Sequence, residues 1–298
     1  MSTILRVLRV LALIVVVGLV GLVLFVIIGS ERRLRRTYAV TVPPVAIPSD
    51  SASLARGKHL FETITCALCH ALDGGGAIVD QDRWIGTVAG PNLTSGRGGV
   101  AAMRSNEDWG RAIMGGVRHD GTSLIVMPSE VFTHLADSDL GALLAYLRQL
   151  PPVDREVPPT RFGLLGRALL AAGRLNILVA PKTADLIAPA SPPPAGTLAY
   201  GRYLADVSGC HGCHGYGLSG GRVAGPPGLP PASNLTPTGI GEWSEADFTR
   251  AMREGMRPDG SPINEFMPWR EYRRMGDDDV HALWLYLRRV PPKDFGNK

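Results

Sequence analysis

Apolar residues follow two patterns along this chain: one long uninterrupted run, and then shorter segments with helical spacing. The long run, Val10 to Gly29, has twenty residues and no charged side chain. An α-helix of that length spans about 30 Å, the thickness of the hydrocarbon core of a bilayer. Later segments such as Leu140–Leu147 and Val280–Leu287 place apolar residues at i, i+3, i+4 and i+7, which predicts amphipathic helices. We find no strand-like alternation of useful length, so the pattern predicts an all-α fold.

The segments with helical spacing belong to an internal repeat with an offset of 139–144 residues. Asn92-Leu93-Thr94 recurs as Asn234-Leu235-Thr236, and Met127-Pro128 recurs as Met267-Pro268. The closing helix of each copy ends at a pair of prolines, because proline cannot continue a helix. The repeat predicts two tandem domains of the same helical fold.

These patterns divide the chain into five parts. Residues 1–36 are expected to form a membrane anchor with a basic flank, residues 37–49 a spacer, and residues 50–152 the first domain. A linker, residues 153–196, leads to the second domain, residues 197–298. The spacer is rich in proline and β-branched residues, a composition typical of extended segments, and we expect it to lift the first domain off the membrane.

The linker has an apolar middle, residues 161–178, in which Arg161, Arg167 and Arg174 are spaced nearly seven apart. We expect a helix there. The favoured interpretation is a helix packed in the interface between the two domains. The alternative is a helix that lies on the membrane surface or against a membrane partner.

The long apolar run has two interpretations, an uncleaved membrane anchor and a cleaved signal peptide. The apolar region of a signal peptide has about 7–15 residues and ends at small residues. The run in this chain is longer, and a basic flank follows it directly. We therefore expect an anchor that crosses the membrane once. The basic flank consists of Arg32, Arg33, Arg35 and Arg36.

The charge distribution bears on possible partners. The chain has a net charge of +4, but residues 1–36 contain six arginines and one glutamate, a balance of +5 that leaves −1 for the rest. The excess of basic residues thus belongs to the segment beside the membrane, and nucleic acid is not an expected partner. Aromatic residues make up only 6% of the chain, so we expect a buried cofactor to supply apolar bulk in each domain.

All four cysteines lie in two C-x-x-C-H motifs, one in each copy. This pattern is the attachment sequence of a c-type haem. The two thiols bond to the porphyrin, and the following histidine lies where it can bind the iron. Cysteine pairs also occur in zinc sites and in thioredoxin-like redox centres, but neither needs a histidine directly after the pair. The residues are Cys66, Cys69 and His70 in the first copy and Cys210, Cys213 and His214 in the second.

Two complete motifs predict two covalently bound haem c groups. Haem is attached to this motif outside the cytoplasmic membrane, so we expect both domains on the periplasmic side of the inner membrane. The positive-inside rule alone would place the basic flank in the cytoplasm. We give the haem motifs precedence and expect the arginines of the flank to lie on anionic headgroups.

The sixth ligand of each iron decides between electron transfer and catalysis. Met127 lies 57 residues after His70, and Met267 lies 53 residues after His214. Both precede a proline at equivalent positions on expected loops, so we predict that both are axial ligands, with sulfur bound to iron. The rival ligands do not recur at matching positions in the two copies. They are His119, His134, His211 and His281.

Together these motifs resemble the class I cytochrome c fold: C-x-x-C-H, then N-L-T, then M-P, then a closing helix with the pattern Asp-Leu-x-Ala-Leu-x-x-Tyr-Leu-Arg. The tandem arrangement resembles membrane-anchored dihaem cytochromes c of bacteria, including cytochrome subunits that accompany periplasmic dehydrogenases. The resemblance covers roughly residues 50–292. It implies that the first helix of each domain crosses the closing helix, bringing Gly57 to the Leu143 region and Gly201 to the Leu283 region.

The resemblance also implies particular surroundings for the haems. The backbone near Pro91 is expected to orient His70, and Asn92 and Asn234 are expected to lie near haem propionates. Extra residues before Asn234 leave open which carbonyl orients His214.

The function that follows is a one-electron carrier with two low-spin haems, tethered to the membrane in a respiratory or similar chain. Its partners would be redox proteins such as a dehydrogenase, a quinol-oxidising complex, an oxidase or a small cytochrome. One alternative is a cytochrome subunit of a membrane-associated dehydrogenase or oxidase complex. Another is a dihaem peroxidase, which needs an open sixth position at one iron. Two matched Met-Pro loops favour the carrier, and we expect no catalytic residues.

The two haem surroundings differ in aromatic cover. Trp269 follows the second Met-Pro pair where the first copy has Ser129, and Trp284 stands where the first has Leu144. Burial without added charge disfavours the oxidised, more positive haem. We therefore expect two reduction potentials, with the second haem the higher.

Overall fold

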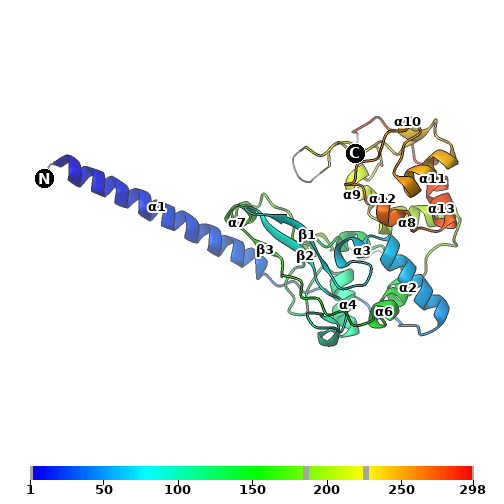
Figure 1. Ribbon diagram of the computed structural model, residues 1–298, viewed down its shortest axis with the longest axis horizontal. Coiled ribbons are helices and arrows are strands. Elements are labelled where there is room, and N and C mark those ends of the chain that lie inside the picture. The colour runs from blue at the N-terminus through cyan, green and yellow to red at the C-terminus, as the bar shows by residue number, and fades with distance from the viewer. Residues whose placement is uncertain (1–2, 184–187, 224–227, 297–298) are drawn as a thin grey trace.

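The computed structural model describes residues 3–183, 188–223 and 228–296. A single long helix, α1 (Thr3–Leu34), extends away from a body of two helical domains (Figure 1). Most of its apolar side chains are exposed, and only Val26 and Ser30 are buried. By length and composition α1 can cross a membrane, which confirms the helix expected over the apolar run.

The first domain is a helical unit in which the first and last helices cross. Its helices are α2 (Ser51–Thr63), α3 (Cys66–His70), a short 3-10 turn η1 (Ala101–Met103), α4 (Asn106–Ile113), α5 (Ser129–Phe132) and α6 (Asp137–Arg148). Helix α6 packs across α2, where a Cβ atom at Gly57 would overlap the carbonyl oxygen of Ala142. The two backbones touch because glycine lacks that atom, and Leu143 lies next to the contact as expected.

The second domain repeats this construction. Its helices are α8 (Leu198–Val207), α9 (Cys210–His214), α10 (Pro237–Ile240), α11 (Glu245–Glu254), α12 (Trp269–Tyr272) and α13 (Asp277–Leu287). Helices α8 and α13 cross at Gly201, where a Cβ atom would overlap the carbonyl oxygen of Ala282. The inserted residues before Asn234 lie partly outside the described residues.

A small antiparallel sheet in the first domain corrects the all-α expectation. Strands β1 (Ala77–Asp82) and β2 (Gly86–Gly90) form a hairpin, and β3 (Arg161–Phe162) of the linker pairs with β2. All but one residue of β1 is exposed. Strand β2 is mostly half-buried, and a hairpin that does not bury one whole face against the core need not alternate apolar and polar residues. The pattern that predicts strands is therefore missing from it.

The spacer is extended, as expected, but it does not separate the first domain from α1. Tyr38 donates its amide hydrogen to the carbonyl of Gly121 at 2.9 Å. Further along, Val42 is buried in the core of the domain and lies against Gly110 of α4. The spacer therefore binds the domain to the end of α1 along its whole length.

The helix expected in the linker exists, but its position is not the favoured one. Helix α7 (Leu164–Ala171) packs against α1 rather than between the two domains. Arg167 donates hydrogen bonds to the Ser30 hydroxyl and the Glu31 carboxylate, both at 3.1 Å. Small residues allow the approach, since Gly29 lies against Ala171. Later in the linker, a short 3-10 turn η2 (Ala180–Lys182) lies beside Gly116, in the loop that follows α4.

A polar cluster lies at the interface between the two domains, and its contacts are approximately two-fold symmetric. Asp139 and Asp279 are equivalent, each three residues into a closing helix, and both are buried. Tyr203 of the second domain donates to Asp139 at 2.7 Å, and His59 of the first domain bonds Asp279 at 2.7 Å. His59 and Tyr203 are also equivalent residues, so each domain offers the same position to the other's aspartate.

Arg56 and Tyr200 lie at the centre of this cluster. The Arg56 guanidinium binds Asp139 through two hydrogen bonds of 2.9 and 2.6 Å and donates a third, of 2.8 Å, to the Tyr200 hydroxyl. Tyr200 then donates to Asp279 at 3.1 Å. Burial acts to raise the pKa of Asp279, but its bond to His59 holds that pKa below the ordinary value. The cluster thus satisfies two buried carboxylates with groups from both domains.

Replacing Asp139 with asparagine is expected to destabilise the body strongly. The change leaves Arg56 with no carboxylate to balance its largely buried charge, and breaking such a pair costs about 3 kcal/mol or more. The free energy of unfolding should fall by that amount in urea titrations of the detergent-solubilised protein. Glu265→Gln is the control, because Glu265 pairs with Arg270 on the exposed surface and should lose little stability. Equal losses in the two variants would contradict the role of the cluster.

Candidate haem sites

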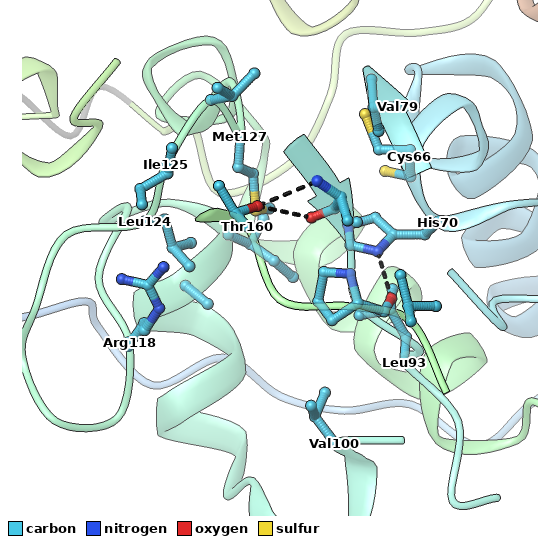
Figure 2. A pocket seen from close by; sticks show the side chains of 18 of the residues that line it. Cys66, His70, Val79, Leu93, Val100, Arg118, Leu124, Ile125, Met127 and Thr160 are labelled. Carbon is cyan, nitrogen blue, oxygen red and sulfur yellow. Dashed lines mark hydrogen bonds between the residues drawn. The ribbon is translucent and has the colours of Figure 1, made fainter. Parts of the chain in front are cut away.

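The first domain contains an apolar cavity of about 450 Å³ that collects the predicted haem residues. Cys66, Cys69, His70 and Met127 all line it (Figure 2). The remaining wall is formed mainly by apolar side chains of the helical core, namely Phe61, Leu93, Trp109, Ile113, Phe132, Leu143 and Leu147. An apolar pocket with one histidine and one thioether facing it suits a flat, largely apolar iron macrocycle.

His70 is held by the residue before the first asparagine of the N-L-T motif. Its Nδ1 donates a hydrogen bond to the carbonyl oxygen of Pro91 at 2.9 Å, which leaves Nε2 to bind a metal. Burial lowers the pKa of His70, and this favours the neutral imidazole, the form that binds iron. The short helix α3 begins after Thr65, whose left-handed φ of 71° turns the chain from α2 into the motif.

Met127 and His70 point into the cavity from opposite sides (Figure 2). The residue before the methionine, Val126, has a left-handed φ of 68°, an unfavourable conformation for a β-branched residue. Its amide bonds to the carbonyl of Ile177 at 3.0 Å. The linker therefore holds the methionine loop in place, a contact between distant segments that no local sequence signal reveals.

In the second domain, the carbonyl that orients His214 is that of Ser233. His214 Nδ1 donates to this oxygen at 2.7 Å. Ser233 stands directly before Asn234, as Pro91 stands before Asn92. The position relative to the asparagine is therefore the same in both domains, and the extra residues of the second copy leave it unchanged.

Met267 occupies the position in the second domain that Met127 has in the first. Both are partly buried and pack against the core. The carbonyl of Met267 accepts a hydrogen bond from Trp269 N at 2.7 Å, and the carbonyl of Met127 accepts one from Ser129 N at 2.9 Å. The same turn follows each methionine, so both methionines occupy equivalent places in the backbone of their domains.

The rival histidines differ in their surroundings. His211 bonds Asp206 at 2.9 Å, and His281 bonds Glu245 at 2.7 Å, so both have carboxylate partners. His134 follows α5 and is not part of the cavity wall. His119 does line the first cavity, which makes it the one histidine to test against Met127.

The two asparagines make hydrogen bonds within the protein, and their proximity to haem propionates stays a prediction. The Asn92 amide nitrogen donates to the carbonyls of Val153 and Arg155 at 2.7 and 3.1 Å, and its oxygen accepts two bonds from Thr94. Asn234 makes the matching bonds to Lys293 and Thr236. Both asparagines therefore hold the segment that follows the closing helix against the N-L-T loop of their own domain.

Arg118 is a cavity residue that the sequence interpretation missed. It lines the first cavity (Figure 2) and donates to the Thr122 hydroxyl and the Ser123 carbonyl. Burial lowers its pKa, although the nearby charge of Asp120 acts in the opposite direction, and within the described part of the chain it forms no ion pair with a carboxylate. A partly buried cation at the wall of a cavity favours an anionic partner there, and a haem propionate would supply that charge. The recurrence of Arg-x-Asp-Gly at 118–121 and 257–260 is the signal that identifies this residue.

The second domain offers matching donors. Arg257 donates to the Ser261 hydroxyl at 3.2 Å and to the Pro262 carbonyl at 2.6 Å, as Arg118 does in its own loop. Nε of Arg250 and Nε1 of Trp269 are buried and have no hydrogen-bond partner in the described protein. Buried donors that the protein does not satisfy suit a group that carries carboxylates. Both domains therefore fit a haem.

The fold and the two sites are those of proteins that hold haem by thioether bonds and carry electrons. A family model for cytochrome c matches residues 54–151 and again residues 198–291, the two helical domains. The chain belongs to the cytochrome c family. It binds two haem c groups covalently, and its domains are of the electron-transfer cytochrome class.

Several relatives are cytochromes. The cytochrome c subunit of alcohol dehydrogenase (quinone) from Gluconobacter oxydans is 36% identical over 107 residues, 33% of this chain and 22% of that protein. The subunit of the same name from Gluconacetobacter polyoxogenes is 28% identical over 275 residues, 82% of this chain and 57% of that protein. A dihaem cytochrome c-type protein of Cereibacter sphaeroides is 28% identical over 311 residues, 89% of this chain and 95% of that protein.

The extent of these matches differs. The chain spans only between 12% and 29% of the length of three relatives, whereas the match to the dihaem protein covers nearly the whole of both chains. Two of those three are the cytochrome subunits of an alcohol and a fructose dehydrogenase.

Replacing each methionine separately tests the axial ligands. Met127→Ala and Met267→Ala should each remove roughly half of the red-edge absorption band that ferric methionine–haem coordination produces, because each removes one sulfur ligand. His119→Ala should leave the band intact. An unchanged band in Met127→Ala, with the whole band lost in Met267→Ala, would show that Met127 is not a ligand and leave His119 as the candidate for the first iron.

Removing the buried positive charge of Arg118 should lower one reduction potential. In Arg118→Leu the oxidised haem loses a repelling cation, so we expect a fall on the order of tens of millivolts. The potential should also become more dependent on pH, since a propionate without its cation titrates at higher pH. Arg118→Lys, which keeps the charge, should shift it less. Spectroelectrochemical titration measures both effects, and a potential unchanged in Arg118→Leu would place the propionates elsewhere.

Proposed function

We propose that the chain relays single electrons from a membrane-associated dehydrogenase to an acceptor of the respiratory chain, through two haems with histidine and methionine ligands. The matched His–Met positions of the two domains carry this proposal, because an iron with both axial positions filled transfers electrons without binding a substrate. The names of the relatives support the choice of a dehydrogenase as donor.

We further propose that α1 crosses the cytoplasmic membrane once and holds both domains on the periplasmic side. Support comes from the exposed apolar surface of α1 and from the two attachment motifs, which are haemylated outside the cytoplasm. The spacer and α7 both bind the body to the end of α1. The body would therefore stay close to the membrane, where a membrane-bound donor can reach it.

Contacts across the domain interface support transfer between the two haems. Helix α5, just after Met127-Pro128, places Val131 against Gly209, the residue before Cys210. On the equivalent side, Glu271 of α12 lies near enough to Cys69 that its charge, after burial, helps to raise the pKa of that thiol. Each methionine loop thus leads into a helix that faces the attachment motif of the other domain.

The same contacts make the two haems unequal. From the opposite domain, the charged Glu271 approaches the first motif, whereas the apolar Val131 approaches the second. Asp206 of the second domain also lies near Cys210, but it is paired with His211 at 2.9 Å. A nearby carboxylate stabilises the oxidised, more positive haem and lowers its potential. In the second domain Trp269 is buried, and Trp284 stacks on Phe248 with ring centroids 5.6 Å apart. Both differences favour a higher potential at the second haem.

Spectroelectrochemical titration should resolve two one-electron steps. Glu271→Gln removes the charge near the first haem and should raise the lower potential by an amount on the order of tens of millivolts, leaving the upper step nearly unchanged. Glu242→Gln, an exposed glutamate of the second domain, serves as control. A single unsplit step, or an equal shift in both variants, would contradict the assignment of the lower potential to the first haem.

A complex subunit is the second candidate, favoured by the relatives that are named as dehydrogenase cytochrome subunits. Gentle solubilisation followed by identification of co-purifying proteins distinguishes it from a free carrier. A stoichiometric dehydrogenase would favour the subunit, and a cytochrome that purifies alone and reoxidises with an isolated acceptor would favour the carrier. Peroxide turnover at physiological rates would overturn both.

A further inference from the structure

The linker helix α7 and the tip of the β1–β2 hairpin form one unit beside the end of α1. Gly163 N donates to the carbonyl of Ile85 at 2.9 Å, and Gly166 N donates to that of Trp84 at 3.3 Å. Arg167 of α7 then joins this unit to Ser30 and Glu31 of α1. Figure 1 shows α7 and the hairpin on the side of the body from which α1 leaves.

This unit exposes large apolar side chains that the body does not cover. Trp84 is 57% exposed, Leu164 59% and Leu165 47%. The guanidinium of Arg83 lies 4.4 Å above the Trp84 ring. Tryptophan with an adjacent arginine, together with exposed leucines, is the composition of protein surfaces at the boundary between lipid tails and headgroups.

The position of the unit along α1 sets its depth. Helix α7 packs against Gly29 and Ser30, and Gly29 is the last residue of the apolar run. In a helix that crosses the bilayer, this residue lies where the hydrocarbon core meets the headgroups. The exposed leucines and Trp84 are carried by the same rigid unit, so they lie at the same boundary.

We propose that Trp84, Leu164 and Leu165, which we call the membrane seat, insert into the outer-leaflet interface of the phospholipid bilayer. The proposal rests on the membrane-crossing role of α1 given above. It gives the first domain two attachments to the bilayer, a spanning helix and a surface patch, so the domain cannot rotate about α1. Leucine and tryptophan side chains enter the acyl boundary, and Arg83 remains among the phosphates.

The seat also fixes the height of the first haem site. The hairpin that carries Trp84 at its tip lines the first cavity with Val79 and Val88 further along its strands. Thr160 of the linker, also in the cavity wall, bonds Ala89 at 3.1 Å. One short hairpin therefore connects the lipid boundary to the first haem site. In the proposed arrangement the first haem is the one that accepts electrons from a donor in the membrane.

The experiment uses a photoreactive benzophenone amino acid placed separately at positions 84 and 165 of the full-length haem protein. The protein is held in nanodiscs of phosphatidylethanolamine and phosphatidylglycerol, irradiated and analysed by mass spectrometry. Position 19, on the exposed apolar surface of α1, and position 216, a tyrosine of the second domain that is 91% exposed, are the controls. Lipid adducts at 84 and 165 should exceed those at 216 about tenfold, because a seated residue stays in contact with acyl chains.

The outcomes separate the seat from the anchor. Adducts at 19 but none above the level of position 216 at 84 and 165 would overturn the seat and leave the anchor intact. Absence of adducts at 19 as well would overturn both. In native membranes, a crosslink from position 84 to a protein instead of to lipid would overturn the seat and show that Trp84 binds a partner subunit. Each variant must keep the haem spectrum of the unmodified protein, which these exposed positions allow.

Discussion

The close crossing of two helices in each domain determines where the haem sites form. At Gly57 and Gly201 the first helix touches the backbone of the closing helix. In both domains the attachment motif begins three residues after the last residue of the first helix, so the crossing fixes its distance from the closing helix. In the first domain, Leu143 and Leu147 of that helix then form part of the cavity wall. Any larger residue at the crossing would force the helices apart and widen the cavity.

The segments added around the two similar cores are different. In the first domain, the hairpin and the linker line the cavity. The linker also holds the Met127 loop through the bond between Val126 and Ile177, and the spacer and α7 bind the body to α1. The second domain has in their place an insertion before Asn234 and more aromatic cover. Two domains with the same iron ligands can thus differ in position and potential, since these properties depend on what surrounds the core.

Local chemistry explains which features the sequence could predict. The attachment motifs, the Met-Pro pairs and the helical periodicity each depend on residues close together in the chain. The hairpin escaped prediction because its strands carry no alternation of apolar and polar residues. The helix α7 was predicted, but its packing against α1 was not, because α1 is more than a hundred residues away in the chain. The only sequence signal for Arg118 is the recurrence of Arg-x-Asp-Gly. Whether a partly buried arginine has a carboxylate partner is known only once the structure places the surrounding carboxylates.

The exchange between His59 and Tyr203 has a consequence for how the two domains came to be joined. An interface in which equivalent positions bind equivalent aspartates is isologous, the type that identical subunits use in a two-fold dimer. A single-domain ancestor with these residues could pair with its own copy. Joining two copies by a linker makes pairing intramolecular, at an effective concentration on the order of millimolar. At that effective concentration, even an interface with modest affinity between free subunits keeps the two domains together.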